Sequence, residues 1–122
     1  GTHVPFHCTA SGKTYLANLP AAKRRTMLAG LDLHQYTETT HTSAATLEQE
    51  LKQVARDGYA LDREEFHEGM VAIAVPVFDS RRRYVAALAT HGPKQRFNVE
   101  DAMTRRSLLV ESAKIITETF GY

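Results

Sequence analysis

The spacing of apolar and polar residues predicts two short helices near the start of the chain. Thr9 precedes a helical stretch over residues 10–18, and its hydroxyl can accept a hydrogen bond from the first turn of that helix. Pro20 suits the first turn of a second helix over residues 21–29, and Gly30 can close it.

A third helix follows a stretch without a clear period. Residues 31–45 are polar and rich in threonine and histidine, so we expect a loop. Thr46 and Gln49 have the spacing of a capping box, and Gly58 can end the helix that they begin. The apolar side chains of this helix fall on one face: Leu47, Leu51 and Val54.

Extended segments dominate the next part of the chain. Residues 59–61 predict a short strand, and residues 71–78 are apolar at almost every position, as in a strand covered on both faces. Pro76 limits the pairing of that strand on one side. Residues 84–90 are its expected hairpin partner, which Gly92-Pro93 should break.

The C-terminal stretch predicts one long helix. Asn98 can cap it, and Asp101 lies where the helix dipole favours a negative charge. Gly121 can stop it, and its apolar stripe contains Leu109, Ala113, Ile116 and Phe120. Helices, then strands, then a helix predict an α+β domain, with helices packed on an antiparallel sheet.

Composition and charge exclude several classes of protein. The 122 residues are 43% hydrophobic and 24% charged, which is typical of one globular domain. A net charge of +1 gives no field that would favour nucleic acid, and residues 81–83, all arginine, follow Asp79 in the expected hairpin turn. Cys8 is the one cysteine, so we expect no disulfide and a cytoplasmic location. We also expect no membrane segment.

Two features suggest a site for an anion. The start of the first helix, Ala10-Ser11-Gly12, leaves backbone N–H groups free, and the helix dipole favours negative charge there. The alternative is that these small residues only allow close packing. Asp62 follows a strand and can accept a hydrogen bond from a ligand hydroxyl, whereas Glu64, Glu65 and Glu68 fit a solvated turn.

The sequence also offers weaker alternatives. His7, His67 and His91, with Asp62 and Cys8, are the residue types of a metal site, but none has the usual ligand spacing, so we expect no metal.

Cys8 or Ser11 as the nucleophile of a small hydrolase is the enzymatic alternative. His7 is the histidine beside Cys8, but side chains of neighbouring residues usually point apart. Ser11 lacks the sequence context of a nucleophile elbow. We therefore expect no enzyme.

Three segments of the chain resemble the effector-binding domain of IclR-type bacterial transcriptional regulators. Residues 6–13 are similar to the family's His-x-Ser/Thr-Ala-x-Gly-Lys segment. Residues 58–65 followed by Gly69 are similar to its Gly-Tyr/Phe-Ala-x-Asp-x-Glu-Glu…Gly segment, and residues 72–79 and 86–93 to its paired central strands. The resemblance implies a GAF-like or profilin-like fold, a curved antiparallel sheet flanked by helices.

The resemblance also implies a site. The carboxylate of a small organic acid would meet the backbone N–H groups of Ala10 and Ser11, while Asp62, Ala72, Ala89 and His91 would line the rest of a cup on the sheet. No cofactor and no metal are implied. Relatives that bind two- or three-carbon oxo-acids carry polar residues where this chain has the two alanines. We therefore expect a larger, partly apolar or aromatic carboxylic acid, with His91 paired to a second polar group.

The implied domain organisation is that of a fragment. Residues 1–122 would form one effector-binding domain that is truncated at its N-terminus, and residues 3–7 would be the end of an element whose beginning is missing. The winged helix-turn-helix of the family would be absent, so DNA would be bound only through that missing domain. Homodimers or homotetramers are expected. The alternative is a stand-alone GAF-like module that binds a small molecule or a metal.

Overall fold

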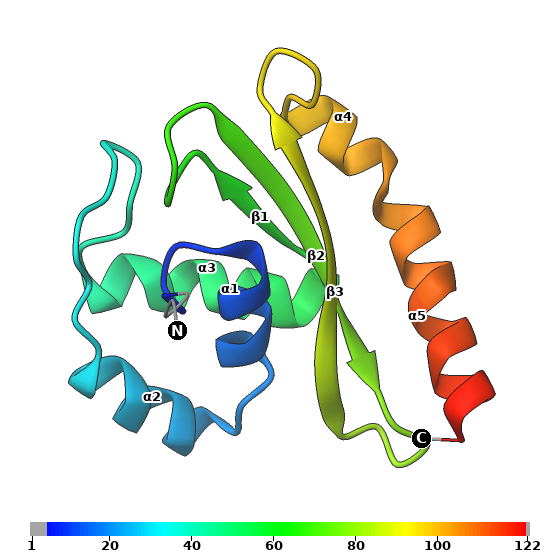
Figure 1. Cartoon of the computed structure of the whole chain (residues 1–122). Helices are drawn as coiled ribbons and strands as arrows, with labels where there is room; N and C mark the ends of the chain where they lie inside the picture. Colours follow the sequence, from blue (N-terminus) through cyan, green and yellow to red (C-terminus); the bar gives the residue numbers. More distant parts are fainter. Residues whose placement is uncertain (1–4, 122) are drawn as a thin grey trace, which may run out of the picture.

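A computed structural model describes residues 5–121, so the expectation for residues 3–7 lies partly outside the described residues. Figure 1 shows a small sheet between two groups of helices. The elements are α1 (Ala10–Ala17), α2 (Ala21–Gly30), α3 (Ala44–Asp57), β1 (Ala60–Arg63), β2 (Met70–Phe78), β3 (Tyr84–Pro93), α4 (Val99–Thr104) and α5 (Arg106–Phe120). The predicted α+β architecture, an antiparallel sheet flanked by helices, is confirmed.

The three strands pair in the order β1-β2-β3, and both pairs are antiparallel. The expected break at Gly92-Pro93 is wrong, because β3 continues to Pro93, which lies opposite Met70. Gly92 is needed inside the strand, since a Cβ there would lie 2.9 Å from the Cβ of Phe97. Strand β1 begins at Ala60, opposite Ala74, so Pro76 stands where β2 has no strand on that side.

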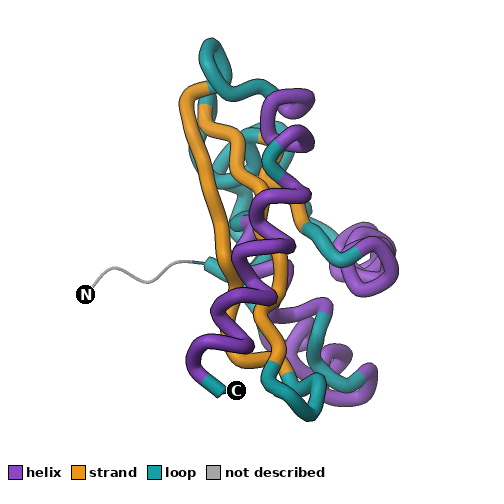
Figure 2. Tube along the Cα trace, turned by 90° about the vertical axis from the view of Figure 1, so that its right-hand side faces the viewer, coloured by secondary structure: helices purple, strands orange, loops and turns teal. Residues whose placement is uncertain are grey.

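Each face of the sheet has its own core. Helices α4 and α5 cover the face of the sheet that carries the alternating apolar residues of β2 (Figure 2). The buried members of this first core are Leu61, Val71, Ile73, Val75, Val77, Ala102, Leu109 and Ala113. Helices α1, α2 and α3 lie on the other side and enclose the second core, whose buried members are Leu16, Ala17, Leu28, Leu47, Leu51, Val54 and Ala60.

The ends of the first helices confirm two local predictions and correct one. Thr9 caps α1, and Gly58 ends α3 with a left-handed φ of 79°. The capping box at Thr46 is wrong: α3 begins after Ser43, whose side chain accepts from the N–H of Thr46. This earlier start places Thr46 inside the first turn.

The expected single C-terminal helix is divided in two. Asn98 and Asp101 form the capping box of α4, and the chain leaves regular helical hydrogen bonding at Arg105 before α5 begins. Gly121 ends α5 in a left-handed conformation with a φ of 66°.

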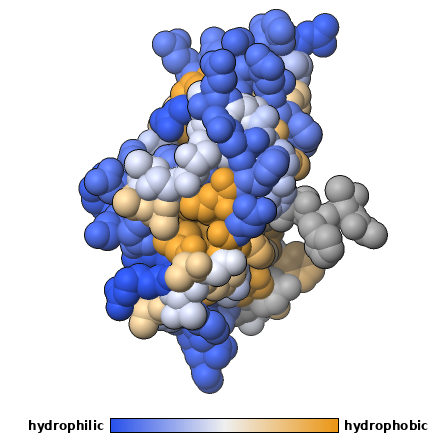
Figure 3. All heavy atoms as spheres, turned by 90° about the vertical axis from the view of Figure 1, so that its left-hand side faces the viewer, coloured by the Kyte–Doolittle hydropathy of each residue, from blue (hydrophilic) through white to orange (hydrophobic). Residues whose placement is uncertain are grey.

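Figure 3 shows the side of the molecule on which α2 and the following segment lie, with apolar surface gathered in the middle and polar side chains around it. Half-buried apolar residues of α2 and the segment after it, Met27, Leu31 and Leu33, pack on the second core. Within residues 5–121, no helix is long and apolar enough to cross a membrane.

Candidate functional site

The first turn of α1 holds backbone N–H donors in a fixed geometry. The hydroxyl of Thr9 accepts from the N–H of Gly12 at 3.0 Å and donates to the carbonyl of Pro5 at 2.9 Å. Gly12 permits residues 5–6 to lie close against this turn, because a Cβ at Gly12 would lie 2.6 Å from the Cα and carbonyl oxygen of Phe6. Helix geometry gives the N–H groups of Ala10 and Ser11 no intrahelical acceptor. Ala10 is buried and Ser11 is exposed.

A buried lysine joins this turn to the sheet. The side chain of Lys13 has no exposed surface. Its Nζ donates to the carbonyl of Leu61, to a carboxylate oxygen of Glu50, and to both oxygens of Glu65 at 2.8 and 2.9 Å. Three acceptor groups around one ammonium satisfy a charge that would otherwise be costly to bury. Lys13 therefore holds α1 against β1, beside the residue that precedes Asp62.

Asp62 is itself held in place. Its Oδ1 accepts from the N–H of Glu65 at 2.8 Å, and the carboxylate of Glu65 accepts from the N–H of Arg63 at 2.9 Å. Asp62 is only 7% exposed. Burial raises the pKa of its carboxyl to about 6, although the N–H of Glu65 opposes the shift. The expectation that Glu65 is a solvated turn residue is wrong, because it is only 3% exposed and pairs with Lys13.

The sheet aligns the other expected site residues. Asp62 lies opposite Ala72, and Ala72 lies opposite His91, so these three form one row across the sheet. Ala89 lies opposite Ala74 in the neighbouring row on the same face. This is the face that α1 packs against, and α1 contacts all three strands. Ala72 is half-buried, whereas Ala89 and His91 are exposed on β3, so the face is open there.

Hydrogen bonds join the segment before α3 to the turn after β1. The sequence did not reveal this contact. The hydroxyl of Thr37 donates to the carbonyl of Glu64 at 2.6 Å, and that of Thr39 to the carbonyl of Arg63 at 2.9 Å. Thr40 donates to the carbonyl of Glu65 at 2.6 Å. Three consecutive carbonyls are thereby satisfied by side chains. The only sequence signal was a cluster of threonines in a loop that was otherwise without pattern.

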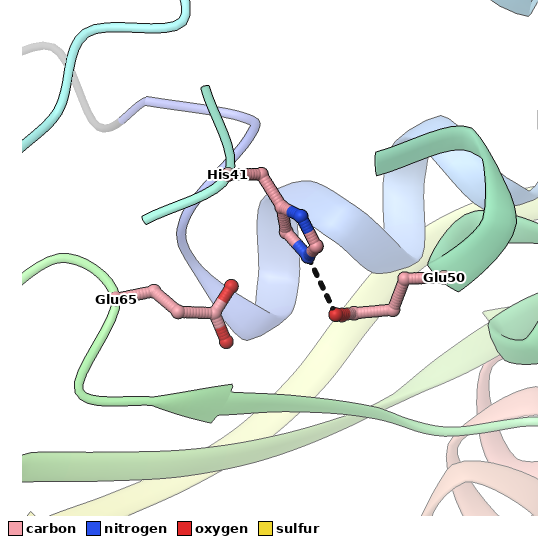
Figure 4. A group of neighbouring side chains, drawn as sticks. All are labelled: His41, Glu50 and Glu65. Atoms are coloured by element: carbon pink, nitrogen blue, oxygen red, sulfur yellow. Dashed lines mark hydrogen bonds and ion pairs between the residues drawn. The ribbon is translucent and has the colours of Figure 1, made fainter. Parts of the chain in front are cut away.

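One group of side chains has the composition of a metal site. His41, Glu50 and Glu65 come from three separate segments and point toward one another (Figure 4), with their ligand atoms all within 4.8 Å. His41 Nε2 lies 2.8 Å from Glu50 Oε1. Burial opposes the charge of Glu50, but the hydrogen bonds and charges of His41 and Lys13 outweigh it and lower the pKa of Glu50 to about 2. Because the Lys13 ammonium already bonds both carboxylates, a metal ion would have to displace it.

The metal group considered from the sequence does not assemble among the described residues. His7 Nε2 bonds to the carbonyl of His34 at 2.8 Å, and the ring of His67 packs on Phe66. His91 is exposed on β3.

Cys8 has the environment of a structural thiol. It is fully buried. Burial and the nearby charges of Asp62 and Glu65 raise the pKa of the thiol to about 12. A catalytic cysteine needs the thiolate near neutral pH, so Cys8 is unsuited to be a nucleophile.

Three comparisons relate the chain to known proteins. The family model described as bacterial transcriptional regulator IclR C-terminal matches residues 1–118. The chain is 41% identical over 103 residues to the probable transcriptional regulator SauR of Cupriavidus necator, covering 84% of this chain and 41% of that protein. It is 36% identical over 122 residues to the HTH-type transcriptional regulator KdgR of Escherichia coli, covering all of this chain and 46% of that protein. The chain thus spans less than half the length of these curated relatives.

Solved structures of transcriptional regulators are also similar to the chain. The C-terminal domain of E. coli KdgR matches with a TM-score of 0.90 at 36% identity, over 100% of this chain and 74% of that one. The inducer-binding domain of a double mutant of the Acinetobacter transcription factor PobR, in complex with 3-hydroxybenzoic acid, matches with a TM-score of 0.90 at 28% identity. That match covers 96% of this chain and 67% of the PobR chain.

Proposed function

The chain belongs to the IclR family of bacterial transcriptional regulators, whose C-terminal domain it matches, and on this premise we propose that it senses a small organic carboxylic acid. Members of this family are transcriptional regulators and not enzymes. The raised pKa of the buried Cys8 thiol fits a domain without a catalytic thiol.

The proposed site lies on the α1 side of the sheet. The ligand carboxylate accepts from the N–H groups of Ala10 and Ser11, where the helix dipole favours an anion. The Asp62 carboxylate accepts a hydrogen bond from a hydroxyl of the ligand. Ala72 and Ala89 form the floor of the site, and His91 forms its outer rim. The observation that carries this proposal is the contact of Lys13 Nζ with the carbonyl of Leu61, which fixes the first turns of α1 beside Asp62.

The proposed ligand is larger than glyoxylate and contains an aromatic ring. Ala72 and Ala89 are small and offer no side-chain donor, while His91 adds one polar group at the rim. A double mutant of the PobR inducer-binding domain, a relative of the same fold, is known in complex with 3-hydroxybenzoic acid. This supports a hydroxylated aromatic acid as the first compound to test.

The proposed output is a change in DNA binding by a longer, cytoplasmic protein. Relatives described as HTH-type regulators are about twice as long as this chain, which leaves room for a winged helix-turn-helix outside the matched part. In a homodimer or homotetramer, a ligand that prefers one subunit arrangement shifts the population toward it and so alters DNA affinity.

Thermal unfolding of the purified chain tests ligand binding directly. A panel should contain 3-hydroxybenzoate, benzoate, glyoxylate and acetate. A ligand present at about 100 times its Kd should add about 2.7 kcal/mol to the free energy of unfolding. We expect 3-hydroxybenzoate to stabilise the chain more than glyoxylate does.

Two variants then locate the site. His91→Ala and Asp62→Asn should each weaken binding of 3-hydroxybenzoate. Lys94→Ala, which changes an exposed lysine outside the proposed site, should leave binding unchanged. Equal affinity in the parent and in both site variants would refute these two assignments.

A further inference from the structure

Aromatic rings gather beside the proposed site. Tyr36 lies edge-on to Phe66, with ring centroids 5.0 Å apart and an interplanar angle of 89°. It also lies edge-on to His34 at 4.7 Å, and its centroid is 6.0 Å from that of His7. Edge-to-face contacts at these distances are favourable for aromatic pairs. Tyr36 thus contacts every other ring of a cluster that comes from three separate segments: His7, His34 and Phe66.

The cluster borders both ends of the proposed anion site. His7 precedes by three residues Ala10, the first helical residue of α1. Phe66 follows Asp62 by four residues, directly after Glu65, whose N–H donates to the Asp62 carboxylate. Tyr36 therefore lies between the segment that leads into α1 and the turn that follows Asp62 and β1.

The cluster is fixed in position, but its aromatic side chains remain partly exposed. The hydroxyl bonds of Thr37, Thr39 and Thr40 to the turn after β1 fix the backbone next to Tyr36. Tyr36 is nevertheless 46% exposed, and Phe66 is half-buried. A large aromatic side chain that is firmly positioned but partly exposed has ring surface to offer to another group.

We propose that Tyr36 and Phe66 form an aromatic side wall of the ligand site and select acids that carry a flat ring. This inference rests on the proposed function and names the groups that recognise the ligand's ring, rather than its carboxylate. The floor of the site offers the methyl groups of Ala72 and Ala89 but no aromatic ring. The wall supplies the apolar and edge-to-face contacts that the floor lacks.

Two acids of matched skeleton test the wall: 3-hydroxybenzoate and 3-hydroxycyclohexanecarboxylate. They share the carboxylate and the hydroxyl, but only the first has a flat ring. Calorimetric titration of the parent chain should show about tenfold preference for 3-hydroxybenzoate, the scale of one good aromatic contact together with its burial. Tyr36→Ser and Phe66→Leu should each reduce this preference, and Tyr36→Phe should keep it.

The preference ratio separates a wall from a merely structural role, because a loosened fold weakens both acids alike. Thermal unfolding of each variant without ligand checks that the fold is retained. If the parent binds 3-hydroxybenzoate and all variants keep its preference, the wall is refuted while the proposed function stands. If the parent binds neither acid nor any other acid of the panel, the proposed function fails and the wall fails with it.

Discussion

Replacing Lys13 with methionine should destabilise the chain severely. The variant keeps most of the apolar stem but removes the ammonium that bonds Glu50, Glu65 and the carbonyl of Leu61. Lys13 is fully buried, and the side chain of Glu65 is 4% exposed. Breaking a buried ion pair from one side costs about 3–5 kcal/mol, because it leaves the partner charged and without compensation. This is a large part of the roughly 5–15 kcal/mol that stabilises a typical domain.

Urea unfolding followed by circular dichroism measures this loss. Lys94→Met is the matched control, because Lys94 is exposed and lies 3.5 Å from Glu64, an arrangement worth about 0–1 kcal/mol. Adding Glu65→Gln to Lys13→Met should recover part of the loss, since a neutral amide needs no cation. A loss below about 1 kcal/mol for Lys13→Met, or no recovery in the double variant, would refute the reasoning.

Three further predictions follow from the same structure. Gly12→Ala should lower the unfolding temperature clearly, because its Cβ would meet the backbone of Phe6 at 2.6 Å; an unchanged temperature would contradict the close approach. The raised pKa of Asp62 means that its stabilising contribution is complete below pH 3.8 and lost as pH rises through about 6. Between pH 4.5 and 7, Asp62→Asn should therefore remove a fall in stability on the order of 1 kcal/mol, and parallel pH profiles of parent and variant would argue against the shift. Ser43→Ala should cost about 1 kcal/mol in urea unfolding and Gln49→Ala less than about 0.5, whereas the reverse order would restore the cap to Thr46.

Local chemistry explains what the sequence predicted well. The caps at Thr9 and Asn98 and the left-handed end at Gly58 depend on a few neighbouring residues, and all three are confirmed. The cap of α3 was misplaced because Ser43 and Thr46 both suit an N-cap, and propensity alone does not choose between them. Strand β3 was predicted too short because glycine and proline usually end strands, whereas Gly92 here makes room for Phe97.

The network around Lys13 could not be predicted because it joins residues far apart in sequence. Glu50 and Glu65 lie 37 and 52 positions from Lys13. A weak signal did exist, since Lys13 shares a helical face with the buried Ala10 and Ala17. A lysine on an apolar helix face implies a buried partner, but the sequence does not show which carboxylate supplies it. The pairing of Asp62 with the row through His91 likewise depends on strand register.

The central claim is that main-chain donors at the start of α1 hold the carboxylate of an organic acid. Titration of the ¹⁵N-labelled chain with 3-hydroxybenzoate, followed by amide chemical shifts, tests it most directly. The account predicts a saturable response with its largest amide shifts at Ala10 and Ser11, together with a change at Asp62. Saturable binding that leaves the amides of residues 10 and 11 unmoved would contradict it.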